Sequence, residues 1–254
     1  MSIAKTYQDI ATSSMFALFI HIYNQDSWEK IFREQMINLR EFSPVILINL
    51  CLTKPGNADL VSSIRSDFPQ AFIIMTPNKG RDIGGKMALM DFFMKAELQS
   101  EYIVFLHDKQ SHHWFGGELW RQKLFQIIEP GKIEAILEEY RNDPKTGIIG
   151  AKDFIKDEFD KKTNEFNTTN NTKIKELLST YNLKLNDHRF VAGAMFWVRS
   201  SILKRFFSMY SALSCREMLE EGNFTDQFEG TYTHSWERIF CFLANGQGYS
   251  IKGI

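Results

Sequence analysis

Cysteine, an excess of charge of one sign and long apolar runs are all scarce in this sequence of 254 residues. Its three cysteines, Cys51, Cys215 and Cys241, stand at long spacings and indicate neither a disulfide framework nor a CxxC zinc site. We expect them to be buried free thiols in a reducing cytoplasm. A formal net charge of −1 lacks the basic excess that is typical of general nucleic-acid binders.

The apolar runs are too short to span a membrane. "MFALFIHI" and "VILINLCL" fall far below the roughly 20 residues that a transmembrane helix needs. The opening stretch "MSIAKTYQDIATSS" is polar and predicts no signal peptide. We therefore expect a soluble protein, for which peripheral association with a membrane surface remains an alternative.

The first half of the chain alternates strand and helix patterns. Hydrophobic residues make up 44% of the sequence, enough for a substantial core. Buried strands are predicted at 15–23, 44–52, 71–76 and 102–106, with helices near 24–39, from 58 and at 86–97. A helix cap is expected at Asn24 or Asp26. This order predicts an α/β fold with a mostly parallel sheet and helices on both faces.

The second half is less regular. Helices are predicted at 118–128, 132–141 and 173–180, and a short strand at 147–151. The charged, Asn- and Thr-rich stretch 152–171 is interpreted as a mobile loop, with a lid as one role. "FVAGAMFWVR" predicts a strand over 190–199 with a central glycine, followed by a helix. A further helix, a glycine turn and a last strand end the sequence. No internal repeat is evident.

Polar residues follow the predicted strands where those strands end. In open α/β sheets, ligands bind at the carboxyl ends of the strands. The polar groups found there are Tyr23 and Asn24, Thr53 and Lys54, the stretch 78–85, and the stretch 107–113. Their convergence is the strongest indication of a binding site that the residues alone provide.

The stretch "NKGRDIGG" (78–85) has the composition of an anion-binding loop. Glycines let a backbone approach a ligand closely, and a helix beginning near Gly84 would offer free N–H groups. Lys79 and Arg81 would add charge-assisted contacts to a phosphate, and Asp82 would accept from a hydroxyl. The stretch is neither the Rossmann GxGxxG nor a P-loop. A plain strand-to-helix turn with solvated charges explains it equally well.

The stretch "HDKQSHH" offers imidazole and carboxylate groups, which are common metal ligands. A metallohydrolase using His107, Asp108, His112 and His113 is therefore one hypothesis. The spacing fits no established metal motif, so a loop whose histidines only form hydrogen bonds is the other interpretation.

Two later motifs carry candidate residues of their own. Gly193 within an apolar strand indicates either the close approach of a ligand or the relief of crowding in the core. In "THSWERIF", His234 and Glu237 are three residues apart and share one helical face. Such a pair can hold an acceptor hydroxyl and take its proton. A surface helix with Glu237 paired to Arg238 is the alternative.

Together and in this order, the motifs resemble the rhamnan synthesis protein F family of bacterial polysaccharide-assembly proteins, which have glycosyltransferase character. The similarity runs from Met15 to Tyr249. The matching stretches are "NKGRDIGG", "YIVFLHDKQS" followed by "LWRQKLF", "FVAGAMFWVRSSIL" and "HSWERIF". The layout is also similar to the wider GT-A glycosyltransferases, which use nucleotide-sugar donors.

The resemblance implies a GT-A-like, Rossmann-type fold in one domain, residues 1–254. It implies a nucleotide-sugar-binding half at 15–115 and a less regular acceptor-binding half at 116–254. The activity implied is that of a hexosyltransferase, inverting in stereochemistry, with Glu237 as catalytic base and His234 orienting the acceptor or replacing Glu237. The implied donor-binding residues are Tyr23, Asn24, Asn78, Lys79, Gly80, Arg81, Asp82, Gly84, His107, Asp108 and Lys109. The implied acceptor-binding residues are Trp114, Gly193, Trp197 and Trp236, although large aromatic residues are also typical of cores.

The sequence departs from GT-A enzymes at the acidic metal motif, where His107 and Lys109 occupy the usual aspartate positions. In one interpretation no cofactor is needed, because the ammonium of Lys109 balances the donor diphosphate. In the other, His107 and Asp108 bind a divalent metal, manganese or magnesium. Like charges repel at short range, which favours the first interpretation.

The partners that the resemblance implies are a nucleotide-sugar donor and a glycan or lipid-linked glycan acceptor of capsule, O-antigen or lipopolysaccharide type. Other glycan-assembly proteins are implied as well, and nucleic acid is not. The implied location is the cytoplasm, at the inner face of the plasma membrane if the chain associates peripherally. A non-catalytic module that binds nucleotide or glycan remains an alternative.

Overall fold

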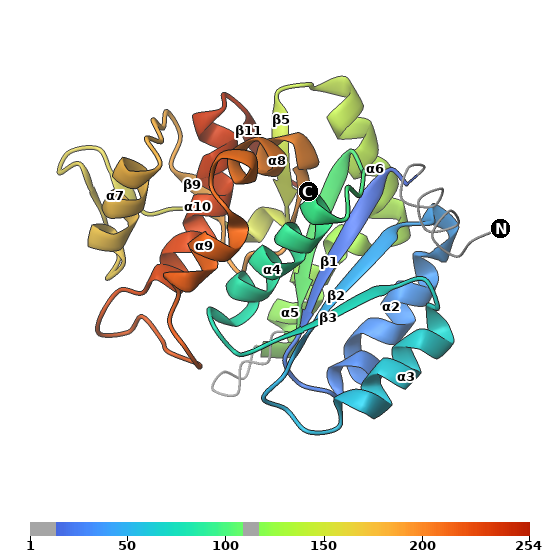
Figure 1. Cartoon of the computed structure of the whole chain (residues 1–254). Coiled ribbons are helices and arrows are strands. Elements are labelled where there is room, and N and C mark those ends of the chain that lie inside the picture. The colour runs from blue at the N-terminus through green and yellow to red at the C-terminus, as the bar shows by residue number, and fades with distance from the viewer. Residues whose placement is uncertain (1–13, 109–116) are drawn as a thin grey trace.

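The computed structural model describes residues 14–108 and 117–254, and Figure 1 shows the whole chain. A central sheet of mostly parallel strands is flanked by helices, which confirms the predicted fold class. In spatial order the strands of this sheet are β11, β5, β10, β4, β1, β2 and β3. Only β10 runs antiparallel to its neighbours β4 and β5. The strands are β1 Phe16–Ile22, β2 Val45–Cys51, β3 Phe72–Thr76, β4 Tyr102–His107, β5 Thr146–Gly150, β10 Phe196–Arg199 and β11 Ser250–Gly253.

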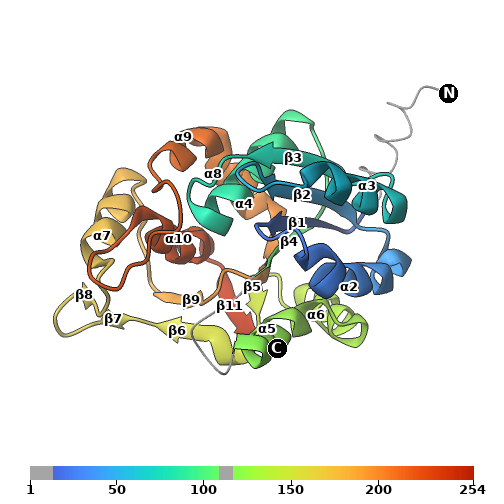
Figure 2. The same cartoon turned by 90° about the horizontal axis from the view of Figure 1, so that it is seen from below.

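The helices lie in two layers, one on each face of the sheet (Figure 2). Helices α4, α8 and α10 cover one face, and α2, α3 and α6 cover the other. A π-helical turn over Trp28–Phe32 leads into α2. The helices are α2 Arg33–Asn38, α3 Asn57–Asp67, α4 Arg81–Lys95, α5 Gly117–Phe125, α6 Pro130–Asn142, α7 Asn171–Thr180, α8 Ser200–Met209, α9 Ala212–Glu217 and α10 Tyr232–Gly246.

The core fills the space between the sheet and both helical layers. β1 and β2 are buried along their whole length, as their continuous apolar runs predict. The three cysteines are buried free thiols, also as predicted. None of the helices within the described part of the chain combines the length and the apolarity that crossing a bilayer requires.

Strand β3 differs from its prediction, because it is only partly buried. It lies at one edge of the sheet and pairs with β2 alone. An apolar run does not distinguish an edge strand from a central one, since both can be rich in isoleucine. Met75, for example, remains 41% exposed.

Helix α4 begins at Arg81, earlier than the predicted start between Gly84 and Lys86. Gly80 precedes it with φ 72°, and Gly84 N–H already donates to Gly80 C=O at 2.8 Å. The prediction of a free N–H at Gly84 for an anion is therefore wrong. The cap predicted at Asn24 or Asp26 is also not formed, since Ser27 occupies the cap position and its side chain makes no capping hydrogen bond to the helix.

The predicted strand over 190–199 is two strands separated by a turn. β9 Arg189–Val191 pairs with β6 Ile155–Asp157 outside the central sheet, whereas β10 lies within it. Gly193 and Ala194, with φ 89° and 49°, make the turn between them. Left-handed backbone at two successive residues ends a strand, and Gly193 marks this point in the sequence.

The stretch 152–171, predicted as a loop, carries short strands. β7 Phe159–Asp160 and β8 Glu165–Phe166 form a small hairpin below α7 in the view of Figure 2. Its Phe166 contacts Phe242 of α10, with ring centroids 5.9 Å apart. Phe159 stacks on His188 with ring centroids 3.7 Å apart. These isolated aromatic contacts have no periodicity that the sequence would reveal. A role as a lid stays a prediction.

Candidate functional site

Three polar side chains stand in one row across the otherwise apolar sheet. His21 of β1 is in register with Asn49 of β2 and with His107 of β4. Asn49 Nδ2 donates to His21 Nδ1 at 2.9 Å, and Thr76 Oγ1 donates to Asn49 Oδ1 at 3.1 Å. Because His21 Nδ1 accepts, its proton resides on Nε2 and the ring is neutral. Burial lowers the pKa of His21 to about 4.

The glycines of α4 allow this helix to lie directly on the polar row. A Cβ atom on Gly85 would stand 2.2 Å from His21 Nδ1 and 2.8 Å from Asn49 Nδ2. A Cβ atom on Gly84 would stand 1.8 Å from Lys79 C=O. The pair of glycines therefore serves the contact between helix and sheet.

Lys86 of α4 is a fully buried cation at the carboxyl end of β4. Its ammonium donates to Asp82 Oδ2 at 2.7 Å and to Ala194 C=O at 2.8 Å, and lies 3.2 Å from His107 Nδ1. Burial alone would raise the pKa of Asp82, but the charges of His107 and Lys86 hold it well below its usual range. Asp82 is therefore ionised and compensates the buried ammonium.

Asp108 clamps the turn that follows β1. Its two carboxylate oxygens accept from Tyr23 N–H at 2.8 Å, Asn24 N–H at 2.6 Å and Ser27 O–H at 2.8 Å. Burial raises the pKa of Asp108 to about 6 against the opposing effect of these donors. The carboxylate thus joins the ends of β1 and β4.

A divalent cation does not fit this donor set. Binding at His107 and Asp108 would compete with the three donors on Asp108 and would bring the metal close to the Lys86 ammonium. Across residues 14–108 and 117–254, no group of three or more His, Cys, Asp or Glu side chains is arranged to hold a metal ion.

Helix α9 and the segment after it hold the loop before α4 and the first turn of α4. Gly80 N–H donates to Glu220 C=O at 2.7 Å. Buried Arg216 donates from Nε to Gly84 C=O at 3.2 Å and from Nη2 to Pro77 C=O at 2.9 Å. These contacts fix the backbone that presents Arg81, which itself has φ 51°.

A chain of amides extends from this loop to the end of β1. Asn78 Nδ2 donates to Asn223 Oδ1 at 3.0 Å, and Asn223 Nδ2 donates to Tyr23 O–H at 2.9 Å. The Lys54 ammonium lies 4.2 Å from the centre of the Tyr23 ring. Lys79 Nζ lies 3.8 Å from a carboxylate oxygen of Glu217 and 3.8 Å from one of Glu221, and such long ion pairs are weak. The predicted donor-side residues Tyr23, Asn78 and Lys79 therefore share one edge.

His234 lies in the first turn of α10, and its side chain contacts Arg81 at the start of α4. Arg81 Nη1 lies 3.2 Å from His234 Nε2, and Thr231 Oγ1 lies 2.6 Å from His234 Nδ1. An arginine only donates, so His234 Nε2 accepts and Nδ1 carries the proton. Burial lowers the pKa of His234, with Asp226 opposing the effect from 3.8 Å.

Glu237 lies one turn further along α10, with its carboxylate held from two sides. Oε1 accepts from Gly193 N–H at 2.5 Å, and Oε2 accepts from Arg238 Nη1 at 2.7 Å. Arg238 in turn donates through Nε and Nη2 to both oxygens of Glu158, at 3.0 and 2.7 Å. The predicted candidates Glu237 and Gly193 are thus in direct contact, and the pairing of Glu237 with Arg238 is present as well.

The remaining candidates lie elsewhere. Trp197 and Trp236 are fully buried in the core, and Trp197 Nε1 donates to Ile127 C=O at 2.8 Å. Neither ring is open to a sugar in this structure. Lys109 and Trp114, together with His112 and His113 of the metallohydrolase hypothesis, lie outside the described residues.

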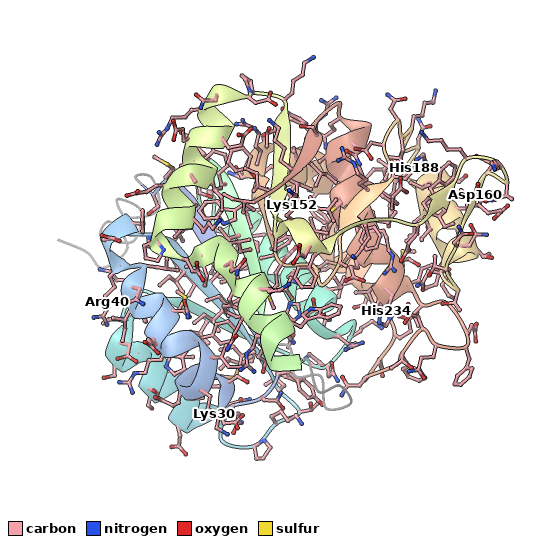
Figure 3. The ribbon with its side chains drawn as sticks, turned by 180° about the vertical axis from the view of Figure 1, so that it is seen from behind. Lys30, Arg40, Lys152, Asp160, His188 and His234 are labelled. Atoms are coloured by element: carbon pink, nitrogen blue, oxygen red, sulfur yellow. The ribbon has the colours of Figure 1, made fainter. Side chains whose placement is uncertain are left out.

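A separate apolar cavity of about 280 Å³ lies at the amino ends of β2 and β3. Arg40 lines it, but this guanidinium donates to Asp67 C=O and lies over the Phe68 ring. Figure 3 shows Arg40 and Lys30 on the side of the molecule away from His234. Because the titratable groups converge at the carboxyl edge, we place the candidate site there.

Several residues of this site are absent from the sequence-based set. His21 and Asn49 interrupt apolar strands, and a polar residue near the end of each run is the signal that would have found them. Lys86 follows Asp82 by four residues, the spacing of a helical ion pair. Arg216 and Asp226 come from the α9–α10 region, where no sequence pattern points to the site.

The family of the chain follows from a comparison with family models. The fold and site define an α/β protein with a polar, mixed-charge centre at the carboxyl edge of its sheet. The chain belongs to the rhamnan synthesis protein F family, whose model matches residues 2–249. This membership supports a role in polysaccharide synthesis.

Two curated relatives are the uncharacterized protein WxcX from two strains of Xanthomonas campestris pv. campestris. Each is 25% identical over 212 residues, which is 82% of this chain. The chain spans 28% of the length of these relatives.

Among solved structures, the chain is similar to the mannosyltransferase PcManGT from Pyrobaculum calidifontis, described in complex with GDP-Man and Mn²⁺. The TM-score is 0.43 at 12% identity, over 99% of this chain and 60% of that one.

Proposed function

We propose that this chain is a glycosyltransferase that moves a sugar from a nucleotide-sugar donor to a growing bacterial surface glycan or lipid-linked glycan. The family supports a role in polysaccharide synthesis. The observation that carries the proposal is the contact of Arg81 with His234 at the carboxyl edge of the sheet, with Glu237 one turn further along the same helix. A cation can balance the leaving diphosphate, and either a carboxylate or an imidazole can take the proton of the acceptor hydroxyl.

The donor binds on the side of residues 15–115. Arg81 is presented by a backbone held in place by Arg216 and Glu220, and its guanidinium suits a phosphate oxygen. Asn78 and Tyr23 offer amide and hydroxyl groups for the nucleotide or its sugar. Since the described donors at His107 and Asp108 do not fit a divalent cation, we propose that basic side chains balance the diphosphate.

The acceptor binds on the side of residues 116–254, within reach of α10. Its hydroxyl oxygen attacks the anomeric carbon, its proton passes to Glu237, and the bond from that carbon to the phosphate oxygen breaks. The nucleoside diphosphate leaves, with inversion at the anomeric carbon. Gly193 N–H and Arg238 each occupy one lone pair of Glu237, and a carboxylate retains further lone pairs for the acceptor.

His234 has two roles open to it in this scheme. Its neutral ring has an unprotonated Nε2, so it can orient the acceptor hydroxyl or take the proton in place of Glu237. Both roles require Arg81 to turn from His234 towards the donor. The donor phosphate supplies the reason for that movement, because it is the stronger partner for a guanidinium.

Replacing the proposed base tests this assignment. Glu237→Gln keeps the shape of the side chain and removes its basicity, so we expect kcat to fall about 10²- to 10⁴-fold. Donor turnover is measured as release of nucleoside diphosphate across a panel of nucleotide sugars. Glu138→Gln, an exposed change of the same kind on α6, serves as the control and keeps the normal rate.

Donor binding is measured separately by thermal shift with nucleoside diphosphates and nucleotide sugars, with and without manganese. A ligand of the native state raises the midpoint, and Glu237→Gln should leave that rise intact. A near-normal turnover rate in Glu237→Gln would refute the base assignment. Binding without turnover in the native chain would instead support a non-catalytic module.

A further inference from the structure

The turn that contacts Glu237 has an unfavourable backbone conformation. Gly193 and Ala194 are both left-handed, with φ 89° and 49°. Glycine tolerates this region, but an alanine in it is strained. Gly193 N–H nonetheless points at Glu237 Oε1 from 2.5 Å. Ala194 N–H donates to Val191 C=O within the turn at 3.2 Å, and a contact from outside the turn would further hold the conformation that aims the Gly193 N–H.

Lys86 supplies that contact. Its ammonium donates to Ala194 C=O at 2.8 Å, one residue after the N–H that binds Glu237. Asp82 Oδ2 accepts a hydrogen bond from another N–H of the same ammonium at 2.7 Å, which fixes Lys86 from its own helix. Hydrogen bonds from a charged donor are stronger than neutral ones, and this one lies wholly out of water.

We propose that Lys86 is a positioning residue for Glu237, acting through the 193–194 turn. The route runs from Asp82 and Lys86 on α4 to Ala194 C=O, and from Gly193 N–H to the carboxylate on α10. It connects the donor-side helix to the proposed base through the backbone of the turn. The inference rests on the proposed function in one respect, the role given to Glu237.

Packing alone does not account for a lysine at this position. A buried charge has a large desolvation cost, and replacing a buried ion pair by apolar residues of similar volume is often neutral or stabilising. Phe105 lies nearby, with its ring centre 5.7 Å from the Lys86 ammonium, so the surroundings would accept an apolar side chain. What an apolar side chain lacks is a donor for Ala194 C=O.

The hydrogen bond at Gly193 can be observed without any assay of activity. In the native chain the Gly193 amide should exchange slowly and resonate downfield, because it donates to a carboxylate. Lys86→Met should speed its exchange at least tenfold and move its resonance towards that in Glu237→Gln. Lys204→Met is the matched control, since Lys204 also donates to a backbone carbonyl, that of Leu98, but far from the turn.

Kinetics then test whether the effect passes through Glu237. We expect Lys86→Met to lower kcat about tenfold or more, with the KM for the donor nearly unchanged. In a Glu237→Gln background the same substitution should cost less than twofold, because the group it positions is already gone. Lys86→Gln, which keeps an N–H donor for Ala194 C=O, should recover part of the loss.

The outcomes separate the two proposals. An unchanged Gly193 amide in Lys86→Met, or an equal loss of kcat in both backgrounds, overturns the positioning role. A near-normal rate in Glu237→Gln overturns the proposed base instead. The exchange of the Gly193 amide still shows whether Lys86 holds the hydrogen bond from Gly193 to Glu237. If Lys86→Met does not fold, Lys86→Gln carries both measurements, and an unchanged amide and kcat in that variant count against the positioning role.

Discussion

At the scale of single residues, the candidate site depends on polar side chains that are kept neutral or paired inside an apolar sheet. His21 is the clearest case, since it is surrounded by core and accepts a hydrogen bond from Asn49. The neutral ring satisfies that bond, whereas a protonated ring would present N–H to N–H. Folding therefore favours the neutral form, which links stability to pH.

His21 should make the folded state less stable in acid. Its pKa falls from an ordinary 6.5 to about 4 on folding, so the unfolded chain binds the proton more tightly. The stabilisation is complete above pH 6.5 and is lost as the pH falls from 6.5 to 4, up to about 3 kcal/mol. Urea unfolding across this range measures it, and His21→Gln should flatten the slope.

Asp108 acts in the opposite direction over part of the same range. Its pKa is raised to about 6, so the folded chain holds this proton more tightly and stability decreases as the pH rises from 4 to 6. Asp108 contributes equally to the native chain and to His21→Gln, so the difference between their free energies of unfolding leaves only the contribution of His21. An identical slope in both would show that His21 does not carry the effect.

The sequence predicts candidate residues within polar motifs better than single polar residues inside apolar runs. Asn78, Arg81, His107, His234 and Glu237 come from motifs with polar composition, and the structure brings them to one edge. His21 and Asn49 lie inside apolar runs, and only the register of the paired strands shows that they are neighbours. Register arises from pairing between distant segments, which one sequence does not display.

At the scale of elements, glycine produced the main errors of boundary. In "GRDIGGK" the glycines indicate a loop, yet Gly84 and Gly85 are inside α4. Their cost to the helix, about 1 kcal/mol each, is offset by close packing of α4 on the sheet. In "FVAGAMFW" a glycine taken as part of a strand marks the turn between two sheets. In both cases the contacts with distant segments, and not the local sequence, determine whether the glycine lies in a helix, a strand or a turn.

Gly85→Ala should therefore destabilise the fold. The new Cβ would stand 2.2 Å from His21 Nδ1, and overpacking of this kind costs roughly 1–3 kcal/mol. Gly131→Ala on α6 is the matched control, because nothing lies within 4 Å of its Cβ. That change should be neutral or stabilise by up to about 1 kcal/mol. Urea denaturation compares them, and equal effects would contradict the packing argument.

At the scale of the whole molecule, the donor-side and acceptor-side halves share one sheet. β10, from the second half, pairs with β4 of the first half on one side and with β5 on the other. α10 packs against α4 as well as against α7, β5 and β9. An alternating sequence pattern predicts the parallel strands, but the insertion of an antiparallel strand between two parallel ones leaves no local trace.

The two halves should consequently unfold together. Removing β10 would open the edge of β4 and take Phe196 away from the Phe105 ring, so neither half retains a closed core alone. Tryptophan fluorescence and far-UV circular dichroism should show coincident transitions in guanidinium chloride. Hydrogen exchange gives the sharper test, because the slowest amides of β1 and of β5 should open with the same free energy. Distinct opening energies for these strands would show that 15–115 and 116–254 are separate folding units, and the proposal of one domain would fail.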